Sequence, residues 1–121
     1  MKVNYITLGG VDYPMCFSLT ASEELSDAFG GLDNISKALG DKDIGNLARA
    51  VNTILIILIK AGRTYVEMTG GKTPPELKCK PADLIDVRDP SAVESIFAAI
   101  SADNSREVEV QLKNAETTQG A

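Results

Sequence analysis

Two short segments place glycine, lysine or carboxylates at spacings that known binding sites use. Gly71-Lys72-Thr73 is the end of a P-loop sequence, but a P-loop needs glycine where Val66 stands. Two prolines follow at once, where that motif needs a helix whose N–H groups face the phosphate. Asp41-Lys42-Asp43-Ile44-Gly45 lacks the further acidic ligands and terminal Glu of an EF-hand loop. Neither segment predicts a nucleotide or metal site.

The chain lacks histidine and has two cysteines far apart, which excludes most familiar enzyme designs. Without histidine there is no Ser–His or Cys–His dyad and no ordinary general base near neutrality. Cys16 and Cys79 cannot form a CxxC motif or a four-ligand zinc site, so we interpret both as free thiols in a reducing compartment. Glu23-Glu24 suits the dipole of a helix start. We therefore predict no catalytic residue, no metal site, no cofactor and no enzyme activity.

Composition and charge narrow the class of protein further. A chain of 121 residues that is 44% hydrophobic fits one globular domain. Seventeen acidic against 12 basic residues give a net charge of -5, which argues against nucleic acid as a partner. The apolar run from Ile54 to Ile59 is shorter than the about twenty residues of a membrane span. We predict a buried helix there, and no membrane or export segment.

The N-terminal third predicts a hairpin and two short helices. Two β-leaning runs flank Gly9-Gly10-Val11-Asp12, which predicts a hairpin over residues 3–19. Thr20 followed by Glu23 matches a capping box, so a helix is expected over about 21–29. A second helix is expected over about 34–39, with Asp33 as its N-cap.

The middle of the chain carries the strongest helical pattern, over about residues 44–68, with Asp41 as the expected cap. Apolar positions at spacings of three and four form its expected inward stripe: Ile44, Leu47, Val51, Leu55, Leu58, Gly62 and Tyr65. A connector with a helical turn at 81–85 follows. Asp89-Pro90 then begins a last helix over about 90–102.

Five apolar residues are candidates for binding a partner. Ile56 and Ile57 lie beside the polar face of the long helix and need a second cover, which is either another helix of the same domain or a partner chain. Val108, Val110 and Leu112 alternate with polar residues, as in a half-buried strand. This strand could extend the hairpin, add to another subunit, or stay disordered until a partner arrives.

The predicted fold is mainly α (α+β). An N-terminal β-hairpin precedes a bundle of about four helices around one long central helix, and a C-terminal strand could follow. Residues 1–104 are expected to form a single domain, and 105–121 a strand or mobile tail.

Two stretches carry a resemblance to a known family: Leu8-Gly9-Gly10-Val11-Asp12-Tyr13-Pro14-Met15-Cys16-Phe17-Ser18-Leu19 and Phe29-Gly30-Gly31-Leu32-Asp33-Asn34-Ile35. Their order resembles the tail assembly chaperones of long-tailed phages and Gram-positive prophages. In that family a hairpin with a Tyr-Pro pair precedes a small helix, an FGxLxxI turn and a long aliphatic helix. The Glu-Val-Glu-Val segment and the Lys-Asn-Ala-Glu-Thr-Thr-Gln end are also similar to the ends of such proteins.

The resemblance implies a non-enzymatic protein of the host bacterial cytoplasm. Such chaperones bind the long, helical tape measure protein and keep it soluble until tail tube subunits assemble around it. Further partners implied are the tail tube protein, a frameshifted longer form of the chaperone, and other copies of it. The alternative from a different class is a structural tail-completion or connector protein that stays in the virion.

Overall fold

The computed structural model describes residues 1–101 and begins with an antiparallel hairpin. Its strands are β1 (Asn4–Leu8) and β2 (Val11–Met15), and Leu8 pairs with Val11 next to the turn. The turn is the two glycines between them, whose φ angles of 60° and 81° are open to glycine with little strain. The predicted hairpin is confirmed, but Val11 and Asp12, expected in the turn, belong to the second strand, which ends at Met15, earlier than expected.

Helix α1 (Leu19–Phe29) begins two residues before the predicted start, so the proposed capping box is wrong. Its N-cap is Ser18, whose side-chain oxygen accepts a hydrogen bond from the Ala21 N–H at 3.1 Å, and Thr20 lies inside the first turn. The last tertiary backbone bond of the preceding chain is made at Cys16. Ser18 is the first residue after that bond whose side chain can cap a helix, and α1 starts there.

Helices α2 (Asp33–Leu39) and α3 (Ile44–Met68) match the expected ranges within one residue, but their caps differ. Asp33 lies in the first turn of α2 and the N-cap is Leu32, which makes no side-chain cap bond. The N-cap of α3 is Asp43, whose carboxylate accepts from the Asn46 N–H at 3.0 Å. The predicted cap, Asp41, instead accepts from the backbone N–H of Asp43 at 2.8 Å. It supports the true cap from two residues upstream.

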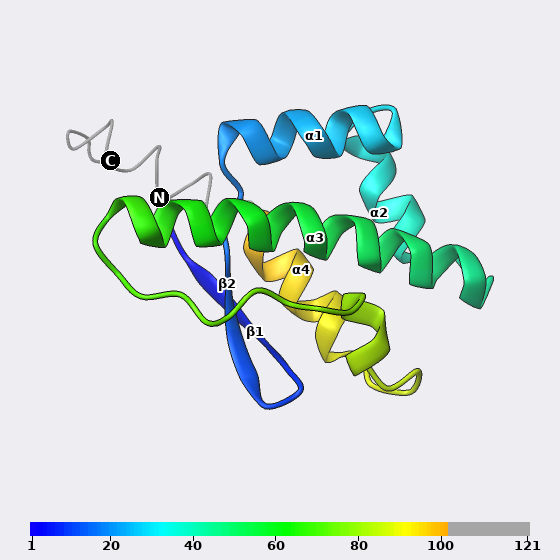
Figure 1. Ribbon diagram of the computed structural model, residues 1–121. Coiled ribbons are helices and arrows are strands. Elements are labelled where there is room, and N and C mark those ends of the chain that lie inside the picture. Colours follow the sequence, from blue (N-terminus) through cyan, green and yellow to red (C-terminus); the bar gives the residue numbers. More distant parts are fainter. Residues whose placement is uncertain (102–121) are drawn as a thin grey trace, which may run out of the picture.

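The inward stripe of α3 is correct in the middle of the helix and wrong at its start. The buried residues are Ala50, Val51, Ile54, Leu55, Leu58, Ile59 and Gly62. Ile44, predicted to face inward, is 56% exposed. A helix of 25 residues is about 37 Å long, and the first turns of α3 extend past the neighbouring helices (Figure 1). The first turn of α3 therefore projects beyond the core.

The connector after α3 contains a 3-10 turn, η1 (Pro81–Leu84), at the predicted place. It is tied to α3 by the side-chain oxygen of Asn52, which accepts from the Ala82 N–H at 2.8 Å. Helix α4 (Ser91–Ile100) follows, slightly shorter than predicted. The predicted start is wrong by one residue, because the N-cap is Pro90, and Asp89 lies before it and accepts from the Ser91 N–H at 2.9 Å.

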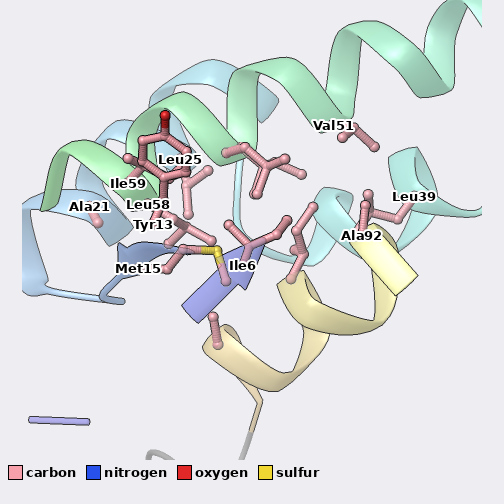
Figure 2. Packing of buried hydrophobic residues seen from close by; sticks show 14 of the residues in the cluster. Ile6, Tyr13, Met15, Ala21, Leu25, Leu39, Val51, Leu58, Ile59 and Ala92 are labelled. Carbon is pink, nitrogen blue, oxygen red and sulfur yellow. The ribbon is translucent and has the colours of Figure 1, made fainter. Parts of the chain in front are cut away.

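Helix α3 is the centre of the fold, with α1 and α2 along one side and the hairpin and α4 along the other (Figure 1). All these elements contribute to one aliphatic core, in which Leu25 of α1, Leu58 of α3 and Ile96 of α4 are fully buried. Figure 2 shows side chains of α3 and the hairpin converging in this core. The predicted mainly helical α+β class is confirmed.

Strand β2 and helix α3 approach so closely that their backbones touch. The Cys16 N–H donates to the Leu58 carbonyl oxygen at 3.1 Å. One turn along the helix, a Cβ added to Gly62 would lie 2.2 Å from the Pro14 carbonyl oxygen and 2.7 Å from the Met15 nitrogen. Only glycine leaves room for the strand at this position.

Among residues 1–101, α3 is the one helix that is long and apolar enough to cross a membrane by length and composition. The core helix of a globular protein passes the same test, and the most apolar side of α3 packs against the elements around it.

Candidate functional site

The two segments whose spacing resembles a P-loop and an EF-hand lie at the two ends of α3. Lys72 is exposed in the connector after α3, and Asp41 and Asp43 bond to the backbone at the start of α3. Within the described part of the chain, no group of three or more Cys, Asp or Glu side chains is placed to hold a metal ion.

Both cysteines are free thiols in very different surroundings. Cys16 is fully buried between the hairpin and α3, and this burial raises the pKa of its thiol, with a smaller opposing effect from the positive N-terminus. A raised pKa keeps the thiol protonated and unreactive near neutrality. Cys79 is exposed on the connector.

The two isoleucines predicted to bind a partner differ in exposure. Ile57 is half-buried and packs against the core, so its cover comes from the same domain. Ile56 is 53% exposed and lies one turn before Lys60, which pairs with Glu24 of α1 at 3.0 Å. Ile56 is thus an apolar side chain beside an ion pair. The other three predicted residues, Val108, Val110 and Leu112, lie outside the described residues.

One apolar concave surface is a groove between the first half of α3, the segment from η1 to residue 89, and the start of α4. We call it the α3–α4 groove. Its larger apolar lining residues are Ile44, Leu47, Val51, Ile85, Val87 and Val93, joined by three alanines. Its volume is about 290 Å³, at the lower end of the roughly 300–1,000 Å³ of small-molecule pockets. This space suits a few side chains of a partner better than a drug-sized ligand.

The groove is open at the mouth and closed at the floor. Val51 and Ala92, both buried, form its floor. At the mouth, Ile44 is 56% exposed and Val87 is 71% exposed. The described part of the chain leaves more than half of each residue exposed, although both are large and apolar. Their exposure costs hydration free energy that a partner could recover.

The charged lining of the groove is acidic. Asp86 and Asp89 are its two charged lining residues. Arg88 pairs with Asp86 at 3.2 Å, and hydrogen bonds from Arg88 hold the pKa of the Asp86 carboxyl below its ordinary value. Asp86 is therefore ionised at neutral pH.

Sequence reasoning missed this groove because its walls come from three distant segments. The periodic stripe of α3 assigned Ile44 and Leu47 to the core. A signal was present in Val87, which stands between Asp86 and Arg88, outside any predicted helix or strand. An aliphatic residue isolated among charges predicts exposure, but not the groove beside it.

Two smaller hollows have mixed linings. One of about 280 Å³ lies between α1, α2 and α3 and includes Asp41, Asn46 and Arg49. Another, of about 220 Å³, lies between α2 and α4 and includes Phe97 and Ser101.

No protein-family model, curated protein or solved structure matches this chain. What the α3–α4 groove binds is therefore inferred from its own shape and charge.

Proposed function

We propose that this protein is a tail assembly chaperone that binds the tape measure protein and keeps it soluble while the tail tube assembles. The observation that carries this proposal is the open apolar groove on an acidic domain, at residues that the core does not cover. The resemblance of the hairpin and FGxLxxI segments to such chaperones, described above, supports the same function.

The surface chemistry suits a chaperone for an apolar helical client. Helix-in-groove recognition places the apolar face of a helix against a hydrophobic groove, and the α3–α4 groove offers that surface. A net charge of -5 keeps the complex soluble while the client's apolar residues are covered. The protein acts by binding alone, without chemistry, in the host bacterial cytoplasm.

The groove is a better client site than the face around Ile56. Affinity at an interface concentrates where apolar side chains enter a pocket and lose all contact with water. Val87 and Ile44 stand at the mouth of such a pocket, whereas Ile56 adjoins the Lys60–Glu24 ion pair. We therefore assign the client contact to the groove, whose lining does not include Ile56.

The test is co-expression with the tape measure protein encoded nearby, followed by co-purification and measurement of the soluble client. Val87→Asp places a charge at the mouth of the groove. Ile56→Asp is the matched control, since it makes the same kind of change, an exposed aliphatic residue to Asp, outside the groove. Losing the burial of one valine, about 1.5 kcal/mol, lowers affinity by about tenfold. Both variants should unfold within about 0.5 kcal/mol of wild type, because both sites are on the surface.

We expect Val87→Asp to lose most of the soluble client and Ile56→Asp to retain most of it. If wild type leaves the tape measure protein insoluble, the proposed function is wrong. A chaperone leaves before the tail matures, so it should be absent from purified virions. Its presence there at the level of a structural subunit would instead favour a tail-completion or connector protein.

A further inference from the structure

We propose that the α3–α4 groove binds an amphipathic helix that has aliphatic side chains on one face and Lys or Arg along the edges of that face. This inference rests on the proposed function, because it specifies the kind of client segment that the groove takes. Two features of the groove carry it: the backbone around it and the charge at its edge.

The backbone around the groove favours a helix over an extended peptide. An extended peptide adds to a partner by pairing its N–H and C=O groups with a free strand edge. Two walls of this groove are helices, whose backbone groups beyond the first turn bond within the helix. In the segment between η1 and α4, the N–H groups of Ile85, Arg88 and Asp89 already donate to Ala82 and Asp86. A helix brings its own backbone bonds and presents only side chains, which is what the groove can accept.

The edge of the groove favours a basic partner. Asp86 and Asp89 line it, and residues 80–94 as a whole carry four acidic and two basic side chains. Lys or Arg beside the apolar face of a bound helix would meet this negative charge, while Glu or Asp would be repelled. Basic side chains also lay their methylene groups along apolar surface while the charge stays in water.

The same charge argues against two other occupants. Residues 102–121 of this chain carry four acidic and two basic residues, so their approach to the groove edge is unfavourable. A second copy of the chain has the same net charge of -5. A partner of opposite charge is the better complement.

The test uses the full chain and three labelled synthetic peptides of about 18 residues, long enough for about five helical turns. The first has Leu and Ile on one face and Lys along its edges. The second replaces each Lys with Glu, and the third scrambles the first so that no apolar face remains. Binding is measured by fluorescence anisotropy at low and at moderate salt.

We expect the Lys peptide to bind at least about tenfold more tightly than either of the others. Val87→Asp should weaken that binding by about tenfold or more. The double variant Asp86→Asn/Asp89→Asn should weaken it by about threefold to tenfold and reduce its salt dependence, because rim charges act mainly through screened attraction. The matched control, Glu23→Gln/Asp27→Asn, removes two exposed charges from α1 and should change binding less than twofold.

Equal binding of the Lys and Glu peptides, or unchanged binding by Val87→Asp, would overturn this inference. Displacement of the Lys peptide by a synthetic peptide of residues 102–121 would overturn it too, by showing that the chain's own segment fits the groove. In either case, co-purification of wild type with the tape measure protein would leave the proposed function standing. The two proposals are thus refuted by different measurements.

Discussion

Replacing Gly62 with alanine tests the closest contact in the fold, where β2 crosses α3. The added Cβ would lie 2.2 Å from the carbonyl oxygen of Pro14, 2.4 Å from its carbonyl carbon and 2.7 Å from the nitrogen of Met15. All three are backbone atoms, so no side chain can rotate away to relieve the overlap. The strand must move outward by about 1 Å to restore ordinary contact distances. That movement stretches the bond between the Cys16 N–H and the Leu58 carbonyl oxygen.

Three effects set the size of the expected loss of stability. Overpacking against a rigid neighbour costs about 1–3 kcal/mol. A buried N–H left without its acceptor costs about 1–3 kcal/mol more. Alanine is better than glycine in a helix by about 1 kcal/mol, which offsets part of this. We therefore expect the free energy of unfolding to fall by about 2–4 kcal/mol, a large part of the about 5–15 kcal/mol of a typical domain.

The matched control is Gly45→Ala in the same helix. Its added Cβ would meet only the ends of the Arg49 and Asp43 side chains, at 3.4 Å or more. Urea unfolding followed by circular dichroism should show the Gly62→Ala midpoint lowered by about 1–2 M, for a slope near 2 kcal/mol per molar urea. The Gly45→Ala midpoint should stay the same or rise. A Gly62→Ala protein as stable as Gly45→Ala would refute the close approach of β2 and α3.

Three further predictions concern the core, the connector and the buried thiol. Leu55→Asp should abolish the helical circular dichroism signal, because an unpaired carboxylate in a fully buried site costs several kcal/mol, and a native-like melt would contradict the core assignment. Asn52→Ala should lower stability by about 1–2 kcal/mol and speed amide exchange at Ala82, which loses its acceptor; unchanged exchange at Ala82 would show that the bond is not formed in solution. Burial raises the pKa of Cys16 above its ordinary value of 9.0, so the unfolded chain ionises first as pH rises, and stability should fall above about pH 9 by at most about 1.4 kcal/mol per pH unit. Cys16→Ala should reduce the loss of stability above pH 9. At neutral pH a thiol reagent should modify exposed Cys79 long before Cys16. Faster modification of Cys16 would disprove its burial.

Local patterns predicted the helices well because their signals lie within the helices themselves. The bounds of α3 follow from a long period of apolar residues between Asp43 and Thr69. The start of α1 was mispredicted because two hydroxyl residues, Ser18 and Thr20, could each cap a helix. The choice between them depends on where β2 stops contacting α3, which is a tertiary property.

The candidate site could not be predicted because it depends on how far one helix extends beyond its neighbours. The helical period placed Ile44 on the same side of α3 as the buried residues, which is correct. It gave no information on whether another element packs against that side at the first turn. Gly62 lay on the same stripe, and nothing in the sequence distinguished its contact with β2 from ordinary helix packing. Ile56 and Ile57 both lie off the stripe and were expected to need a second cover. Ile56 is 53% exposed whereas Ile57 packs against the core, so a position off the stripe did not distinguish them.

The contact between β1 and α4 joins the beginning of the described chain to its end, and so constrains the order of events during synthesis. The hairpin leaves the ribosome first, but Ile6 and Leu8 stay without part of their cover until α4 has been made. At about 5–20 residues per second, several seconds separate the two. During that interval the nascent chain exposes the apolar side of its own hairpin. The α3–α4 groove, which Ala92 and Val93 help to line, likewise forms only after α4 has been made.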